Sequence, residues 1–180
     1  MALTAGSYIV NSQAQISGAT IAPQGNASPN GLASPEAEAL STGGLSLAFG
    51  TGTDQADILC AGQFSIAGGG GTLTIDLYAG TDLKDVFGGT AAVRTLKAVH
   101  IDIDSGGDTT GVTIGSAGAN PHPLFFSATN DRWTVFPGGP PLSGGGGAGV
   151  AVTNTVKNVL ITNNGAVAVV VDVFVAGTSV

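Results

Sequence analysis

Charged side chains are scarce in this sequence. Lys, Arg, Asp and Glu together make up 9% of its 180 residues, whereas about 25% is usual for a soluble domain. A free monomer depends on a charged surface for its solubility, so we expect other chains to cover much of this one. The 12 acidic residues outnumber the 5 basic ones, and the net charge is −7. The basic residues are scattered and form no run that could neutralise phosphates, so we expect no nucleic-acid partner.

Cysteine, aromatic residues and long apolar runs are also rare. Cys60 is the single cysteine, so no disulfide forms within the chain. Aromatic residues make up 6% of the chain, too few to predict a stacking surface for sugars or bases. The longest apolar segment, near Ala166–Ala176, contains Asp172 and is about half a membrane span, so we expect no membrane partner. The start MALTAGSYIV has no basic or long apolar segment, and we expect no signal peptide.

Small and polar residues dominate the N-terminal part of the chain. Residues 1–44 show little apolar periodicity. We therefore predict an extended N-terminal arm, with one strand near Ser7–Val10 and one helical turn near Pro35–Leu40. The tripeptide Asn-Ala-Ser at 26–28 fits a glycosylation sequon, which we interpret as a chance match.

From residue 45 onward, short apolar runs rich in Val, Ile and Thr recur between Gly, Asn, Asp and Pro residues. Such runs predict strands. The expected strands are Leu45–Phe49, Gln63–Ala67, Thr72–Tyr78, Leu96–Asp104, Val112–Ile114, Arg132–Phe136, Val150–Thr153, Lys157–Thr162 and Val167–Ala176. Single helical turns are predicted at Ala56–Ala61 and Asp82–Phe87. The pattern indicates an all-β fold, an antiparallel, jelly-roll-like β-sandwich that occupies residues 45–180 as one domain.

The last predicted strand is apolar on both faces. Its alternation places Val167, Val169, Val171, Val173 and Val175 on one face. The other face carries Ala168, Val170 and Phe174 together with Asp172. A strand of this kind is normally covered on both sides, which predicts a central position in its sheet. A neighbouring subunit, or a loop or arm of the same chain, could provide the second cover.

Three glycine tracts separate predicted strands: Gly68–Gly71, Gly138-Gly139 and Gly144–Gly147. We predict hairpin tips or flexible loops at these positions. A phosphate-binding loop would lead into a helix and end in Lys and Ser or Thr. The tracts lead into strand-like sequence without a lysine, so no phosphate site is expected.

The densest group of chemically active residues is HIDIDSGGD at residues 100–108. Strand alternation places His100, Asp102 and Asp104 on one face, opposite Val99, Ile101 and Ile103. We interpret the segment as a strand that runs into a turn, because Gly and Asp favour turns. A weak cation site and a catalytic cluster are the alternatives.

A calcium loop aligns only in part with this segment. Asp102, Asp104 and Asp108 would take the first, third and seventh positions, and Gly107 would provide the sharp turn. However, Gly106 stands at the fifth position, and Thr113 replaces the final glutamate. We therefore assign no metal site.

Other candidate residues lack the partners that their chemistry requires. His122, between two prolines, has no second His or Cys at metal-ligand spacing, and we predict a loop histidine. Cys60 is predicted to be a small buried hydrophobe. Asp82 and Asp85 lie in a turn-like DLKD segment and are interpreted as part of a capped helical turn. We assign no catalytic, cofactor-binding or metal residue and expect no enzyme.

Several segments together resemble a family of tailed-phage virion structural proteins. They are ADILCAGQFSI, LTIDLYAGTDLKDVFGG, LKAVHIDID, VTIGSAGANP, WTVFPGGPPL, VLITNNGA and VDVFVAGTS, within residues 54–178. They resemble the family in turns and core strands, so no functional residue is transferred. The resemblance implies a β-sandwich component of a virion.

We therefore expect a capsid decoration, or cement, protein, made in the host cytoplasm and located on the capsid surface. Its partners would be two further copies of itself in a homotrimer and the major capsid protein or other virion proteins. A tail, baseplate or fibre module that binds glycans is one alternative, for which Phe125, Phe126 and Trp133 are the nearest aromatic candidates. A glycan-acting hydrolase that uses Asp102 and Asp104 is another.

Overall fold

The computed structural model describes residues 7–10, 14–17, 45–85, 87–106, 108–115, 118–125 and 131–179. All regular elements in these residues are strands. They are β1 (Ser7–Val10), β2 (Ala14–Ser17), β3 (Leu45–Phe49), β4 (Gln55–Ala56), β5 (Ile58–Ile66), β6 (Thr72–Asp76), β7 (Lys84–Asp85), β8 (Thr95–Gly106), β9 (Val112–Ile114), β10 (Trp133–Val135), β11 (Leu142–Ala151), β12 (Asn158–Asn163) and β13 (Val169–Thr178). No helix long and apolar enough to cross a membrane occurs in these parts of the chain.

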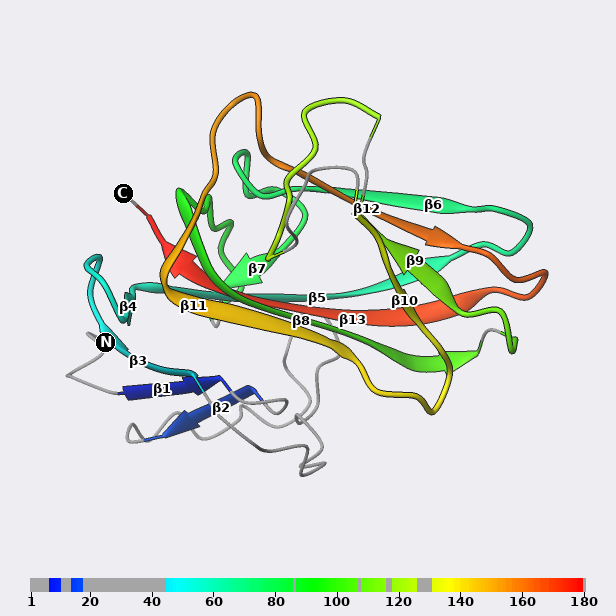
Figure 1. Cartoon of the computed structure of the whole chain (residues 1–180), viewed down its shortest axis with the longest axis horizontal. Coiled ribbons are helices and arrows are strands. Elements are labelled where there is room, and N and C mark those ends of the chain that lie inside the picture. The colour runs from blue at the N-terminus through cyan, green and yellow to red at the C-terminus, as the bar shows by residue number, and fades with distance from the viewer. Residues whose placement is uncertain are drawn as a thin grey trace.

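Two antiparallel sheets pack together and confirm the predicted sandwich (Figure 1). One sheet has the strand order β11-β8-β13-β5-β7, and the other has β10-β9-β12-β6. Antiparallel pairs join β5 to β13, β6 to β12, β8 to β11, and β9 to β10. These four pairs are nested along the chain, as in one long hairpin rolled up on itself. This arrangement is jelly-roll-like, with most connections crossing between the two sheets.

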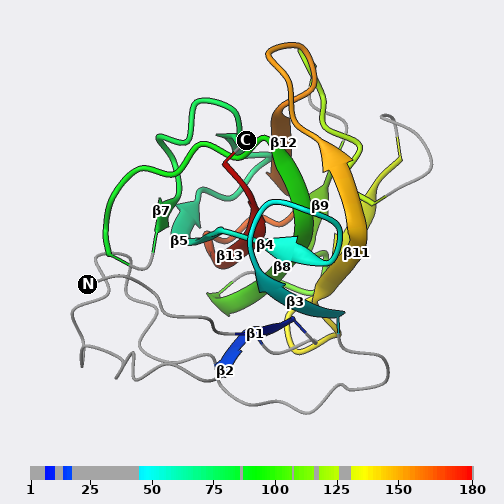
Figure 2. The same ribbon diagram turned by 90° about the vertical axis from the view of Figure 1, so that its left-hand side faces the viewer.

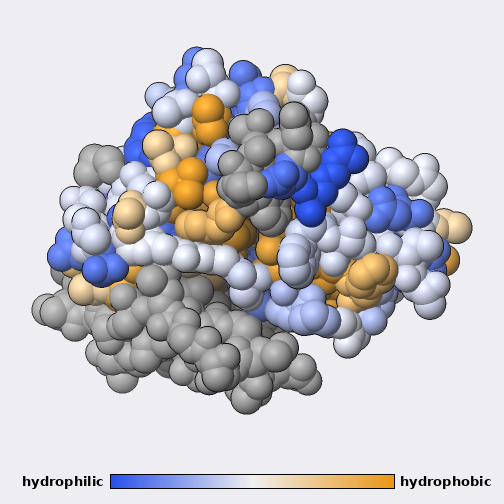
Figure 3. Space-filling model, in the orientation of Figure 1, coloured by the Kyte–Doolittle hydropathy of each residue, from blue (hydrophilic) through white to orange (hydrophobic). Residues whose placement is uncertain are grey.

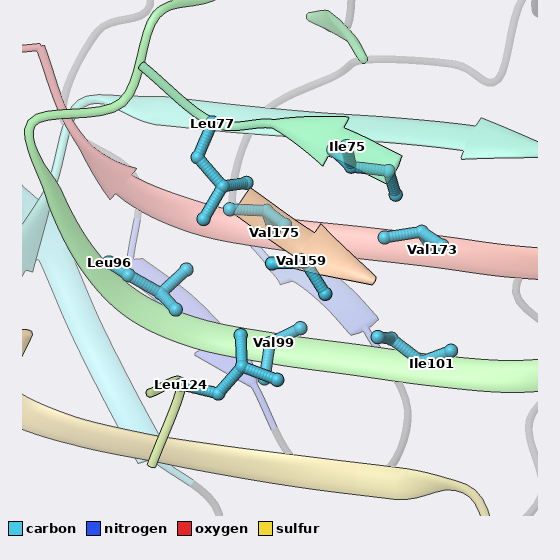
Figure 4. Close-up of a pocket in the computed structure, with 9 residues that line it drawn as sticks. All are labelled: Ile75, Leu77, Leu96, Val99, Ile101, Leu124, Val159, Val173 and Val175. Carbon is cyan, nitrogen blue, oxygen red and sulfur yellow. The ribbon is translucent and has the colours of Figure 1, made fainter. Parts of the chain in front are cut away.

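The core lies between the inner faces of the two sheets. The burial of β13 alternates along its first half, as strand geometry requires, and Val171, Val173 and Val175 are at most 2% exposed. β13 is the middle strand of its sheet, as its apolar sequence predicts. Figure 4 shows a narrow apolar space between the sheets, too small to hold a water molecule. It is lined by Ile75, Leu77, Leu96, Val99, Ile101, Leu124, Val159, Val173 and Val175.

A third, smaller sheet has the strand order β2-β1-β3-β4. Figures 1 and 2 show β3 and β4 beside the C-terminal end of β13. There Leu47 and Ala56 pack with Leu59, Ala98 and Ala176 on the outer face of the large sheet. The same chain therefore covers part of the second face of β13.

Several local predictions are confirmed. The predicted bounds of β1, β3 and β9 agree with the structure, and most other strands overlap their predicted ranges. The tracts at 68–71 and 138–139 lie in turns. Residues 18–44, with the predicted helical turn and the sequon, lie outside the described residues, and the domain boundary at residue 44 stays a prediction.

Three local predictions are wrong. Ala56–Ala61 belongs to β4 and β5, and Asp82–Phe87 contains β7, so neither described segment is helical. Gly144–Gly147 lies inside β11 instead of a loop. Gly144 and Gly145 pair with Val99 and Ala98 of β8, and this pairing outweighs the weak strand propensity of glycine.

Glycine is required where β11 bulges. The register with β8 shifts between Gly145 and Val150, and Gly149 has φ +74°, a conformation that glycine adopts without strain. A Cβ atom on Gly147 would collide with the Asp54 carboxylate. The tract therefore allows the loop before β4 to approach β11 closely.

Candidate interaction surface

The segment HIDIDSGGD forms a strand that runs into a turn, as predicted. Residues 100–106 belong to β8, and the Gly111 N–H donates to the Asp108 carbonyl at 3.3 Å in the turn that follows. The Asp108 carboxylate accepts hydrogen bonds from the Thr110 N–H and the Ala166 N–H, both at 2.9 Å, and from the Thr110 hydroxyl. The Thr110 bonds are the main cause that lowers the Asp108 pKa. Asp108 therefore ties its own turn to the loop between β12 and β13.

The folded chain brings a third acid to Asp102 and Asp104. Asp172 on β13 stands directly opposite Asp102 and also opposite Gln63 on β5. The Gln63 side chain donates to Asp172 Oδ1 at 3.0 Å. Partial burial raises the pKa of Asp172, the nearby Asp104 and Asp102 raise it further, and the Gln63 bond opposes them. Because Asp172 lies 68 residues or more beyond the other two acids, no local motif predicts this group.

The spacing of these acids aligned only in part with a calcium loop, and the described residues show what each acid does instead. The register between β8 and β13 shifts beside Asp104, so this exposed residue lies in a bulge. The Asp108 carboxylate is already bound by N–H donors. Among the described residues, no group of three or more His, Cys, Asp or Glu is arranged to hold a metal ion.

His100 completes a polar region on the same outer face. Its Nδ1 lies 2.7 Å from the Ser143 hydroxyl on β11, and its partner on β13 is Phe174. Burial lowers the pKa of His100, and the charge of Asp102 opposes that shift. We call the group Gln63, His100, Asp102, Ser143 and Asp172 the polar face.

The other end of this outer face is the covered end, formed by Leu47, Ala56, Leu59, Ala98 and Ala176. Beside the covered end, Lys97 holds the loop before β4 in place. Lys97 is 3% exposed, and its ammonium group donates to the carbonyls of Gly52 at 3.2 Å, Gly147 at 2.7 Å and Ala148 at 2.9 Å. The register between β8 and β13 shifts at Lys97. Sequence reasoning missed this role, for which the only signal was a lysine within an apolar strand.

The remaining candidate residues are structural. Cys60 is a free, buried thiol, and burial, with a smaller effect of Asp85, raises its pKa to about 12. This confirms the predicted small buried hydrophobe. Asp85 accepts hydrogen bonds from the Phe87 and Gly89 N–H groups at 2.9 and 2.7 Å, and Asp82 accepts from the Asp76 N–H at 2.8 Å. His122 lies in a loop as predicted, but it is only 1% exposed.

Uncovered apolar side chains concentrate at both ends of β10. Trp133 is 47% exposed and Phe136 is 48% exposed, while Val135 between them is buried. β10 and β11 contact each other and are the edge strands of the two packed sheets on the same side of the sandwich. Neither strand contains a charged residue. We call Trp133, Phe136 and the β11 strand the edge surface.

Exposed apolar residues are not confined to this surface. Phe49, Phe87 and Val167 are also at least 45% exposed. On the face of the molecule seen in Figure 3, apolar residues reach the surface in more than one place among hydrophilic ones. The edge surface differs from these single residues because it combines two exposed aromatic side chains with an uncharged edge strand.

Comparison with protein-family models, with curated proteins and with solved structures found no match to this chain.

Proposed function

We propose that this protein is a structural component of a phage particle and that it acts as a capsid decoration protein. A trimer would sit on the capsid surface and contact several copies of the major capsid protein. Because such a protein binds the assembled shell, it stabilises the shell by mass action. No enzymatic step is part of this role.

The edge surface is the observation that carries the proposal. Aromatic side chains are the usual anchors of protein interfaces. A free strand edge without charges is prone to pair with another chain, and proteins that remain alone usually protect such an edge. Trp133 and Phe136 provide such anchors, and β11 is an uncharged edge strand that the same chain covers only in part, at Gly147 and Ala148. They provide a surface that a second chain can cover.

Fold and composition support the same role. Viral capsid domains are among the proteins that use jelly rolls, although lectins and cupins use them as well. The charged fraction of 9% suits a surface that is buried on assembly. The resemblance of several segments to tailed-phage virion proteins is a further, independent reason.

The first experiment measures the oligomeric state by light scattering. We expect a mass three times that of the 17.4 kDa chain. The double variant Trp133→Ala, Phe136→Ala should weaken the trimer about tenfold or more, since buried aromatic anchors dominate interface energies. Phe87→Ala removes a side chain that is 67% exposed away from the edge surface, and it should leave the trimer intact. A stable monomer at high concentration would overturn the oligomeric part of the proposal.

The second experiment locates the protein by electron microscopy of purified particles that carry it. Density for the sandwich on the capsid surface would support a decoration protein. Density on the tail or baseplate would replace that role with the fibre or tail alternative. Its absence from the particle would contradict a virion role.

One observation favours the glycan-binding fibre module as the second candidate, namely the exposed indole of Trp133. Phe125 does not join it in an exposed cluster, because Phe125 packs against the core. Phe126 lies outside the described residues. Glycan-array binding that is lost in Trp133→Ala would favour this candidate over the decoration protein.

A further inference from the structure

Leu124 fills the apolar space between the two sheets. It is 1% exposed and points into this space together with Ile75 and Val159 from one side and Val99 and Val175 from the other (Figure 4). Its φ of +53° lies in the left-handed region, which is unfavourable for a bulky side chain. Such a conformation persists only where neighbouring contacts hold it.

His122 provides one of those contacts. Its Nδ1 accepts a hydrogen bond from the Leu124 N–H at 2.9 Å. The rest of the loop is bound to the start of β12: the His122 N–H donates to the Asn158 carbonyl at 2.9 Å, and the Asn120 carbonyl accepts from the Lys157 and Asn158 N–H groups at 3.0 and 2.9 Å. The imidazole therefore helps the core packing to hold Leu124 in place.

This arrangement requires a neutral imidazole. A ring that accepts at Nδ1 carries its proton on Nε2, and Nε2 is buried without a hydrogen-bond partner among the described residues. A second proton would convert Nδ1 into a donor aimed at the Leu124 N–H, so the hydrogen bond would be lost. The charged ring would also lie in a site that offers it little solvation.

Few groups near His122 oppose this effect. Lys157, just before β12, and Asp76, at the end of β6, pair with each other at 2.6 Å. The backbone of Ala151, at the end of β11, is close enough to favour the protonated ring, although it makes no well-formed hydrogen bond with Nε2. Burial outweighs it and lowers the pKa of His122 from 6.5 to about 4. A folded pKa below the unfolded value means that the loop contact is fully stable above about pH 6.5 and weakens as the pH falls toward about 4.

We propose that His122 and Leu124 form an acid-sensitive plug: protonation of His122 releases Leu124 and opens the apolar space between the sheets. Nδ1, the unpaired Nε2 and the left-handed Leu124 are three geometric observations that point to the same device. The released segment is the described loop 118–125, and the exposed surface consists of apolar side chains of both sheets.

Hydrogen exchange tests the plug in the full chain between pH 7 and about pH 4. After correction for the intrinsic pH dependence of exchange, protection of the amides in 118–125 should fall about tenfold or more on acidification, while β8 and β13 stay protected. A dye that binds exposed apolar surface should gain fluorescence over the same interval. Unchanged protection of this loop in a folded protein would overturn the proposal.

Two variants separate His122 from general acid effects. His122→Asn keeps an acceptor two residues before Leu124, as in an Asx turn, and does not titrate, so its loop should stay protected at both pH values. His100→Asn removes the only other histidine and should behave as the unmodified chain does. Acid opening that persists in His122→Asn, or disappears in His100→Asn, would contradict the plug.

Nuclear magnetic resonance of the unmodified chain provides a test that needs no variant. The ring signals of the two histidines titrate separately, and the loop amides should shift with the midpoint of His122. Amides that follow the midpoint of His100 would overturn the proposal even if His122→Asn failed to fold.

Discussion

The two ends of the outer face of the β13 sheet differ sharply, although β5, β8 and β13 run through both. At the covered end, Leu47 and Ala56 pack over Ala176, and the apolar side chains are buried by the same chain. At the polar face, Asp102, Asp172 and Gln63 form a row across β8, β13 and β5. The outer face of β13 therefore needs no second subunit as its cover. Among the described residues, the edge surface is the place where two exposed aromatic side chains lie beside an uncharged edge strand.

The largest expected effect comes from placing a charge at the covered end. Ala176→Asp would bury an unpaired carboxylate beneath Leu47, and we expect it to lower the free energy of unfolding by about 4 kcal/mol. Urea denaturation measures the change. The control variant Ser65→Asp puts the same charge at an exposed site on β5. It should lower the free energy of unfolding by less than about 1 kcal/mol. If Ala176→Asp and Ser65→Asp lowered the free energy of unfolding equally, the covered end would be open to solvent.

Removal of the Lys97 ammonium group should have the next largest effect. Lys97→Met leaves the carbonyls of Gly52, Gly147 and Ala148 without this donor. We expect the free energy of unfolding to fall by about 3 kcal/mol. Hydrogen exchange should also rise in the loop before β4 ahead of the core strands. Lys84→Met, in the short strand β7, is the control and should change stability by about 0.5 kcal/mol or less. If Lys97→Met left the free energy of unfolding unchanged, the lysine would not hold this loop in place.

The smallest effect is expected at the polar face, and it has the opposite sign. Asp172→Asn removes the repulsion from Asp102 and Asp104 and keeps an amide oxygen that can accept from Gln63. The free energy of unfolding at pH 7 should therefore rise by about 0.5 kcal/mol, because solvent screens the charges at this partly exposed site. The pKa of Asp172 is raised, so its charge destabilises the fold above that pKa, and the gain should vanish as the pH falls through it.

The comparison of Asp172→Asn with the unmodified chain is measured as the urea denaturation midpoint of each protein at neutral and at acidic pH. Gln63→Ala is the reverse test, because it removes the hydrogen bond that stabilises the charged form of Asp172, and it should lower stability at pH 7. A loss of stability in Asp172→Asn would show that the carboxylate has a favourable partner.

Sequence reasoning succeeded where neighbouring residues decide the outcome. Alternation of Val171, Val173 and Val175 predicted a central strand, and the Gly and Asp residues after β8 predicted its turn. It failed where distant contacts decide. Gly144 and Gly145 belong to a strand because they pair with β8, and Asp82–Phe87 is not helical because β7 pairs with β5.

The sequence alone determined the strand-rich pattern, the apolar faces of the strands, the low charge and the absence of any disulfide within the chain, since these follow from composition and from the two-residue period of a β-strand. Only the tertiary structure decided that Asp172 joins Asp102, that Lys97 binds three carbonyls, and that His122 holds Leu124 between the sheets. The reason is physical: the nested pairing of strands brings together residues that are far apart in the chain, and their burial and hydrogen bonds exist only after that pairing.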